Sequence, residues 1–319
     1  MAGKLLVGVA IQGRDANDAI DQIARAERAG IDAAWATMGG AGGTDLLVTF
    51  GAALVRTERI VLGTSIVHTW AKRPLAYAQE AAALAQLGPG RFRLGLGATT
   101  APMAARQYGV EHRKPLTQLR EYIAAIRTLL RDGQIDYQGD MVQVRARLAG
   151  APLEVPVMGS AVQPGAYEMC GEFADGAISW MCPLSYLVDV AAPAVRRGAE
   201  RAGREAPPIV AHVPVALTTD RDEARARARQ QLAMYGQVPN YQKMFALAGH
   251  QVAAAGDYSD DLLDDLVVSG TEAEVAAALR RRIEAGVEVL AQPLAPAPTE
   301  GQAEHLAAVF AAVGAAARG

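Results

Sequence analysis

The run LLVGVAI at residues 5–11 is followed by DANDAIDQIARAERA at 15–29 and then by IDAAWA at 31–36. The first and last runs are short and apolar, as buried strands of a parallel sheet are. The middle run places its apolar residues on one stripe at helical spacing and stops at Gly30, which is typical of a helix C-terminus. Together the three runs predict a strand, a helix and a second strand, which is a βαβ unit.

The same alternation continues along the chain and predicts six further strands. Eight strands, each followed by helical sequence, predict a (β/α)8 TIM barrel that forms one domain over residues 1–319. An open doubly wound sheet is the alternative, but it would normally need a Gly-x-Gly-x-x-Gly turn after the first strand, and residues 11–14 do not supply one. The further strands are expected at residues 60–67, 91–97, 155–158, 176–180, 209–217 and 287–292.

Two insertions interrupt the alternation. After strand four, a long loop at 98–114 and a helix from Pro115 precede residues 135–144, which read as a hairpin with a Gly-Asp turn. After strand seven, a largely helical stretch at 220–266 is too long for one crossover. Later helices are expected at 164–173, 184–202, 271–285 and 300–317, and Thr271 with Glu274 forms the sequence pattern of a capping box.

Composition excludes several functional classes. The net charge of -3 and the absence of a basic block argue against a nucleic-acid partner. The two cysteines, Cys170 and Cys182, lie in no CxxC or metal-ligand pattern, so neither a disulfide framework nor a metal site is expected. The first residues lack the pattern of a signal peptide, and no apolar stretch approaches the roughly 20 residues that cross a bilayer. We therefore expect a cytoplasmic protein that acts away from membranes.

If the chain forms a barrel, the residues at the C-terminal ends of its strands are the candidate site residues, because barrel active sites lie there. The side chains at those ends are mostly uncharged, with two histidines among them. The candidates are Gln12, Thr37, Met38, Ser65, His68, Trp70, Gly97, Thr99, Thr100, residues 158–164, Ser179, Trp180, His212 and Gln292.

Several of these segments together resemble the luciferase-like flavin and deazaflavin oxidoreductases, in particular the subgroup that uses coenzyme F420. The resemblance spans nearly the whole chain, and its motifs are specific in combination although each is weak alone. It rests on Gly30 to Trp35, Leu62 to Ser65, Gly90 to Gly97, Pro156 to Gly176 and Tyr235 to Tyr241.

The resemblance implies which residues hold the cofactor. In this family strand three carries a non-prolyl cis peptide behind the flat ring, and here it would be Ser65–Ile66, with Val67 following. The alternative is that Ser65 simply ends a buried strand. Gly95 and Gly97 would let the ring approach the top of the barrel closely, unless they serve tight packing alone. Gly97, Ala98 and Thr99 belong to the expected cofactor site. Ser179 and Trp180 complete the expected ring site.

The segment from Gly159 to Pro164 is the expected phosphate site. It lies between strand five and a helix that Pro164 opens, and free backbone N–H groups at a helix N-terminus favour an anion. An ordinary strand–helix turn is the alternative. The residues are Gly159, Ser160, Ala161, Val162, Gln163 and Pro164.

The resemblance favours F420 over FMN, and the charges near the site agree. F420 carries an anionic tail of phospholactate and glutamates, and basic side chains on nearby loops would suit it. Such side chains are equally expected to be merely solvated. They are Lys72, Arg73, Arg106, Arg113 and Lys114.

The chemistry implied is hydride transfer between the deazaflavin and a small substrate with a C=C, C=N or C=O bond. Many relatives carry an acid and a histidine just after strand two, but this chain has Met38 and Gly39 there. His68 and His112 are therefore the expected catalytic residues, with Tyr108 and Glu111 as other proton carriers nearby, although each histidine could equally be solvated or structural. Trp70 and Trp180 would wall the pocket or fill the core.

Three functions remain open at this point. The first is an F420-dependent reductase, the second is an FMN-dependent monooxygenase of the same fold, and the third is a flavin-binding protein without turnover. The resemblance also implies a homodimer, with the Ala-rich helices after strands two and three against the partner.

Overall fold

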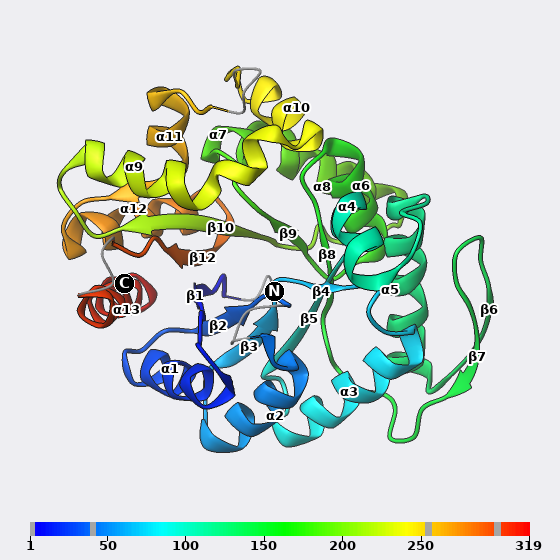
Figure 1. The fold of residues 1–319 in the computed structure, drawn as a ribbon. Coiled ribbons are helices and arrows are strands. Elements are labelled where there is room, and N and C mark those ends of the chain that lie inside the picture. Colours follow the sequence, from blue (N-terminus) through cyan, green and yellow to red (C-terminus); the bar gives the residue numbers. More distant parts are fainter. Residues whose placement is uncertain (1–3, 39–42, 253–256, 297–300) are drawn as a thin grey trace.

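Eight parallel strands close a barrel, surrounded by helices (Figure 1), in a computed structural model that describes residues 4–38, 43–252, 257–296 and 301–319. Neighbouring strands pair in chain order, and the ring closes where the last strand pairs with the first. The predicted TIM barrel is therefore confirmed. Its strands are β1 (Val7–Ala10), β2 (Ala33–Ala36), β3 (Val61–Thr64), β5 (Phe92–Gly97), β8 (Val157–Ser160), β9 (Ala177–Ser179), β10 (Ile209–Ala216) and β12 (Val287–Pro293).

Within the described residues, four short strands lie outside the eight barrel strands. The strand predicted at 60–67 is present as β3 and β4 (Val67–His68), and the cis peptide expected at Ser65–Ile66 lies between them. β11 (Val268–Ser269) extends the pairing of β10. The predicted hairpin is present as β6 (Gln134–Gln138) and β7 (Gln143–Arg147), and it projects beside α5 (Figure 1).

Most helices begin and end close to the predicted residues, because caps and prolines fix them locally. α6 (Pro164–Phe173) matches its predicted bounds, and Thr271 and Glu274 form the capping box of α12 (Glu272–Glu284). The other crossover helices are α1 (Ala16–Arg28), α2 (Leu46–Arg56), α3 (Pro74–Leu87), α5 (Pro115–Asp132) and α13 (Gln302–Arg318).

The helix predicted at 184–202 is present as one continuous helical run over residues 184–201, but it is not regularly α-helical throughout. The chain forms a short turn of helix at α7 (Leu184–Tyr186), a π-helical turn η3 (Leu187–Ala191) and then α8 (Ala192–Arg201). Pro193 lacks the backbone N–H that a regular helix would pair with the carbonyl four residues earlier, so the regular pattern cannot run through this position.

Trp35 fills the interior of the barrel and is 1% exposed. It fits because two neighbouring positions have no side chain: a Cβ atom would lie 2.2 Å from the Trp35 ring at Gly63 and 2.8 Å from it at Gly8. Below this layer, Arg93 and Glu288 form an ion pair of 2.6 Å. The barrel is thus packed through its lower part, which leaves the strand ends for ligands.

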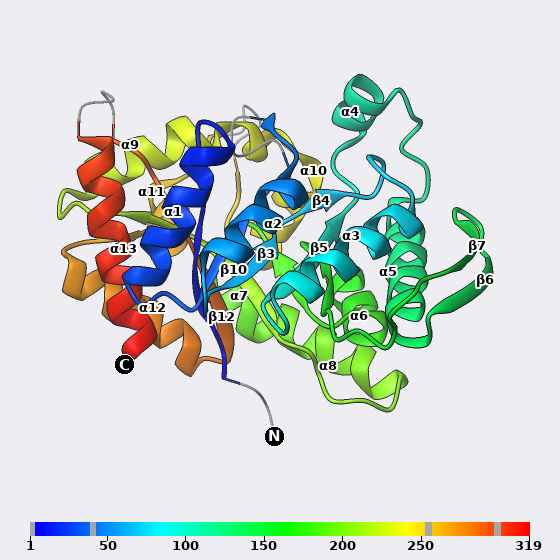
Figure 2. The same cartoon turned by 90° about the horizontal axis from the view of Figure 1, so that it is seen from below.

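Both predicted insertions lie on the side of the barrel where the strands end, opposite the N-terminus (Figure 2). The first contains α4 (Ala101–Met103) and the π-helical turn η2 (Ala104–Tyr108). The second contains α9 (Arg221–Leu232), the 3-10 turn η4 (Ala233–Gln237), α10 (Pro239–Leu247) and α11 (Asp260–Leu266). These elements form the upper walls of the site.

Candidate active site at the mouth of the barrel

A cavity of about 370 Å³ opens among the strand ends. Its volume falls in the range of roughly 300–1,000 Å³ that small-molecule sites have. Six barrel strands and the α9–η4 segment contribute to it, so it depends on residues from most of the chain. The lining residues are Ala10, Ile11, Gln12, Gly13, Ala36, Thr37, Ser65, Trp180, His212, Gln231, Leu232, Met234, Tyr235, Gln292 and Leu294.

The cis peptide at Ser65–Ile66, which the family resemblance implied, is confirmed. Ser65 lines the cavity and its backbone N–H donates to the carbonyl of Ala36 at 2.8 Å. The Ile66 carbonyl accepts from the backbone N–H of Met38 at 3.0 Å. Ile66 and Val67 do not line the cavity, so the interruption of strand three presents Ser65 alone of these three predicted residues to it.

The predicted residues after strand four are held by contacts within the protein. A Cβ atom at Gly97 would lie 2.7 Å from the Ile66 side chain and 2.8 Å from the Ser160 hydroxyl, so packing alone requires glycine there. The Ala98 carbonyl accepts from the Trp70 indole at 2.9 Å. Thr99 adopts a φ of 58°, and its carbonyl lies 3.2 Å from His112 Nε2. These contacts fix the start of the first insertion.

The predicted phosphate segment ends β8 and begins α6. Among the described residues, the backbone N–H groups of Val162, Gln163 and Gly165 form no hydrogen bond within the chain. The segment itself is braced, because the Tyr186 hydroxyl donates to the Val162 carbonyl at 2.8 Å and the Gln163 amide donates to the Asn240 carbonyl at 2.6 Å. A fixed set of free donors at a helix N-terminus is suited to an anion.

Two residues of this segment serve the core. Gly159 is enclosed, since a Cβ atom there would lie 2.9 Å from the Cys170 sulfur, and Ala161 is 2% exposed. Gly165 instead faces open space, with nothing within 4 Å of an added Cβ atom. None of residues 159–164 lines the 370 Å³ cavity, so the structure places the predicted phosphate segment beside the cavity wall.

The predicted catalytic histidines lie in different surroundings. His68 is buried and its Nδ1 atom lies 2.7 Å from the Tyr108 hydroxyl, which also lies 3.5 Å from the Met38 sulfur. Burial lowers the pKa of His68, so its ring is neutral near pH 7. His112 is half-buried, and its ring packs against Trp70 with centroids 6.1 Å apart. Neither histidine lines the cavity, and Gly39 lies outside the described residues.

Three ring side chains line the cavity directly: Trp180, His212 and Tyr235. His212 on β10 packs edge-on against Trp180, with ring centroids 4.7 Å apart, and Tyr235 also packs edge-on against Trp180, with ring centroids 5.5 Å apart. His212 and Gln292 were among the predicted strand-end candidates, but not among the predicted catalytic or cofactor residues. The alternation of strand β10 could place His212 at the mouth, whereas its contact with Trp180 and Tyr235 needs the closed barrel. Ser179, 1% exposed, donates to the Val210 carbonyl and serves the core.

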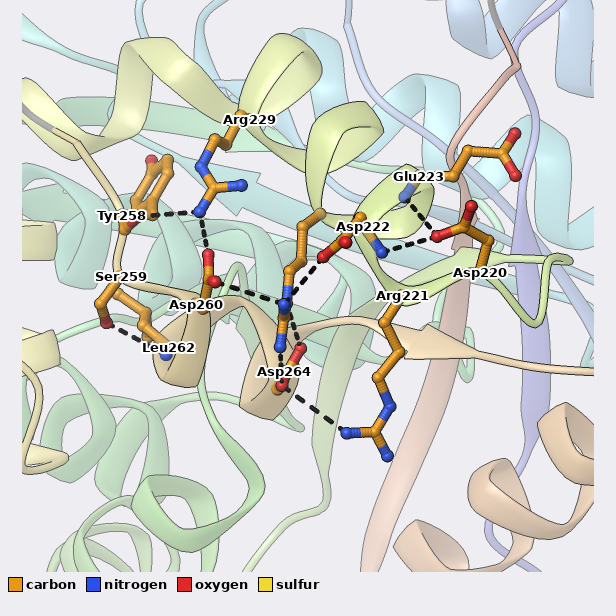
Figure 3. Close-up of polar contacts among 11 residues, drawn as sticks. Asp220, Arg221, Asp222, Glu223, Arg229, Tyr258, Ser259, Asp260, Leu262 and Asp264 are labelled. Atoms are coloured by element: carbon orange, nitrogen blue, oxygen red, sulfur yellow. Dashed lines mark hydrogen bonds and ion pairs between the residues drawn. The ribbon is translucent and has the colours of Figure 1, made fainter.

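Charged contacts between α9 and α11 hold the second insertion together (Figure 3). Arg225 contacts Asp222, Asp260 and Asp264, and Arg229 pairs with Asp260. These ion pairs hold α9 in place, and α9 ends with two residues of the cavity lining. The network therefore supports the site without entering it.

Of the five basic residues expected to suit an acidic tail, two are engaged in ion pairs within the chain. Lys72 is held by Asp45 at 2.9 Å and Glu80 at 2.6 Å, and Lys114 pairs with Asp140 at 3.0 Å. Both lysines are therefore engaged within the chain, contrary to the expectation that they are available to an acidic tail. Over the described ranges, Arg73, Arg106 and Arg113 are exposed and form no ion pair.

Comparison with known proteins gives the family. Residues 6–288 match the luciferase-like monooxygenase family, and the chain belongs to it. It is 27% identical over 298 residues to the 5,10-methylenetetrahydromethanopterin reductase of Methanolobus tindarius, covering 85% of this chain and 89% of that one. It is 29% identical over 224 residues to the F420-dependent glucose-6-phosphate dehydrogenase of Amycolatopsis mediterranei, covering 66% and 67%.

A solved structure supports the fold. The chain superposes with a TM-score of 0.79 on an F420-dependent secondary alcohol dehydrogenase in complex with an F420–acetone adduct, at 22% identity over 98% of this chain and 99% of that one. Within the described ranges, no helix is long and apolar enough to span a membrane. The same residues contain no cluster of His, Cys, Asp or Glu side chains that could hold a metal ion.

Proposed function

We propose that the protein is an F420-dependent oxidoreductase that transfers hydride between the deazaflavin and a small organic substrate. The observation that carries the proposal is the likeness to a relative named as F420-dependent over 66% of the chain, within a family whose model matches residues 6–288. The site fits such a cofactor in two respects: it has a cavity at the strand ends and free donors at a helix N-terminus beside it.

The phosphate of the cofactor would be held at the start of α6. Val162, Gln163 and Gly165 offer backbone N–H groups there, and the helix dipole adds a favourable field. Pro164 opens the helix without needing a partner for its nitrogen. Ser160 and Gly97 lie next to each other at the same strand ends, where the linker to the ring would pass.

The free arginines would bind the acidic tail of F420. Arg73, Arg106 and Arg113 are exposed on loops that follow strands three and four, and no carboxylate of the described chain pairs with them. Guanidinium groups bind phosphate and carboxylate oxygens in a bidentate manner. FMN lacks such a tail, so these residues favour F420.

When bound in its reduced form, F420 supplies a hydride to an electrophilic carbon. The protein would orient the substrate and deliver a proton. His68, joined to Tyr108, is the proposed proton carrier, because its buried neutral ring and the phenol form a connected pair. His112 belongs to the loop that would cover the substrate.

A titration tests the cofactor. Purified protein is titrated with F420 and, separately, with FMN, while absorbance and fluorescence are followed. The proposal predicts saturable binding of F420 and weaker binding of FMN. Tight binding of FMN with no binding of F420 would favour the alternative, an FMN-dependent monooxygenase, which the name of the family also allows. Binding of F420 without oxidation of its reduced form by any enone or imine would favour a binding protein without turnover.

We also propose a homodimer. Val48 and Val55 are 74% and 66% exposed, and Gly51 lies between them on the same face of α2. Leu87 at the end of α3 is 47% exposed and lies against that face, 3.6 Å from an added Cβ atom at Gly51. This apolar strip would be covered by the same strip of a second copy, as a two-fold axis allows.

A further inference from the structure

A second cavity, of about 380 Å³, lies at the end of the barrel where the strands begin. Arg93 is the second residue of β5, Pro156 and Pro208 directly precede β8 and β10, and one face of α5 completes the wall. We call this space the floor cavity. It shares no lining residue with the cavity at the mouth, and its volume also falls in the range of small-molecule sites. The proposed function leaves it without a role.

Three arginines line the floor cavity, and two of them already hold a carboxylate. Arg127 donates from Nε and Nη2 to the two carboxylate oxygens of Asp175, at 3.0 and 2.7 Å. Arg131 donates from the same two atoms to both oxygens of Asp132, at 2.7 and 2.8 Å. The Nε–Nη2 edge of a guanidinium group thus binds a carboxylate in a bidentate manner at both positions.

The third arginine, Arg93, has the same edge without a partner. Its Nη1 atom donates to Glu288 at 2.6 Å, while its Nε and Nη2 atoms form no hydrogen bond with a described residue. The side chain is 19% exposed, and both nitrogens retain accessible surface. A free bidentate edge on a largely buried guanidinium group in a cavity wall is suited to a ligand that presents two coplanar oxygens.

The charges around the floor cavity are balanced over the described part of the chain. Each of the three arginines faces a carboxylate. A fourth cation, Arg204, lies 3.7 Å from Asp175, and Glu154 is exposed at the rim without an ion pair. An entering dianion would therefore create a larger excess of negative charge than a monoanion would, near groups that solvent screens poorly. The balance favours a ligand with a single negative charge.

The rest of the wall is apolar, and an inorganic anion would leave it uncovered, whereas a hydrocarbon group would bury it favourably. We propose that the floor cavity binds a small organic monocarboxylate, whose two oxygens accept from Nε and Nη2 of Arg93 while its hydrocarbon body covers the apolar wall. The site is separate from the proposed cofactor site and does not rest on the proposed function. The apolar residues are Leu130, Leu153, Val155, Pro156, Met158 and Pro208.

NMR on the full chain, labelled with ¹⁵N, tests the proposal. The probes are benzoate, benzamide and inorganic phosphate: benzamide keeps the shape of benzoate without its charge, and phosphate has charge without a hydrocarbon body. We expect benzoate to shift the Nε–H signal of Arg93 saturably, and to bind at least about tenfold more tightly than either other probe. Equal binding of benzamide or phosphate, or benzoate binding that leaves the Arg93 signal in place, would overturn the proposal.

Two variants with the same substitution test the free edge. Arg93→Lys keeps a positive charge beside Glu288 but has no planar pair of donors, so benzoate should bind about tenfold more weakly or worse. The variant also identifies the Arg93 signal, which it removes. Arg131→Lys is the matched control, because its edge lies in the same cavity but is occupied by Asp132. It should change benzoate affinity less than about twofold. Equal weakening in both variants would show that the edge of Arg93 is not the binding group.

A third variant leaves the core untouched. Glu154 is exposed at the rim, and Glu154→Lys replaces a like charge by an opposite one. Benzoate should bind about three- to tenfold more tightly, and benzamide should be unaffected. Unchanged benzoate affinity in this variant would contradict the assignment, even if Arg93→Lys fails to fold. Benzoate binding that Arg93→Lys leaves intact and that F420 abolishes would place the ligand at the mouth of the barrel and likewise overturn the proposal.

Discussion

The Nδ1 atom of His68 lies 2.7 Å from the hydroxyl oxygen of Tyr108, a residue 40 positions further along the chain. His68 ends strand β4, while Tyr108 ends the π-helical turn η2 of the first insertion. The rings also meet edge-on, with centroids 5.8 Å apart. The His68–Tyr108 pair thus joins the interrupted third strand to the segment that borders the mouth of the barrel.

Tyr108→Phe removes the hydroxyl and keeps the ring contact. If the pair carries the proton, kcat should fall by about tenfold or more, since positioned acid–base groups contribute roughly 10²–10⁴-fold. The affinity for F420 should not change, because neither residue is proposed to hold it. Steady-state kinetics and a cofactor titration measure the two quantities. Unchanged kcat would show that the pair is only a structural link.

Gly165→Asp tests the phosphate site without disturbing the core, because the position is open. A carboxylate in the first turn interacts favourably with the helix dipole, so the free energy of unfolding should stay the same or rise slightly. The same carboxylate repels a phosphate, and F420 affinity should fall by tenfold or so, which is about 1.4 kcal/mol. Gly165→Asn is the uncharged control, expected to bind F420 nearly as the parent does. Equal affinity in the Asp variant would mean that the phosphate lies elsewhere.

The lowered pKa of His212 predicts that the free energy of unfolding decreases in acid. Its pKa falls from 6.5 to about 3 on folding because burial disfavours the charged ring. Between these pH values the unfolded chain binds a proton that the native protein does not, so the free energy of unfolding falls as the pH decreases. The slope from this group approaches about 1.4 kcal/mol per pH unit.

Denaturant unfolding between pH 7 and pH 4 measures this slope. His212→Phe should make it shallower, although His68 and His305, whose pKa values burial also lowers, keep part of it. An identical slope in the variant would show that His212 takes up its proton in the native state.

Val55→Asp tests the proposed dimer face. A charge in the centre of the apolar strip should convert the dimer into a monomer, because the carboxylate would be desolvated in the interface. Sedimentation or light scattering reads the mass directly. Val188→Asp, at another exposed valine (40% exposed), is the control and should leave the mass unchanged. A parent protein that is monomeric at all concentrations would contradict the proposal.

The sequence predicted the barrel because strand and helix signals are local. Pro164 fixes the start of α6, and the Thr271–Glu274 pair fixes that of α12. The predicted hairpin also formed, but the sequence did not show that buried Glu121 would accept three backbone N–H groups of its turn, at 2.8 to 3.0 Å. That contact depends on how α5 packs, which no local rule determines.

The site was less predictable for the same reason. Strand alternation placed His212 and Trp180 near the mouth, but their edge-on contact requires β9 and β10 to be neighbours. Tyr235 joins them from η4, directly after α9, a helix that ion pairs dock against α11 (Figure 3). The charges that hold Lys72 and Lys114 likewise come from residues distant in sequence.

Oxidation of reduced F420 tests the central claim most directly. The protein is mixed with reduced F420 without oxygen, and the absorbance of the oxidised deazaflavin is followed with a ketone, an enone or an imine present. We predict that oxidised F420 appears at a rate that rises with the concentration of at least one of these acceptors, and that reduced FMN does not replace it. Reduced F420 that persists with every acceptor, from a protein that instead binds FMN and consumes oxygen, would contradict the account.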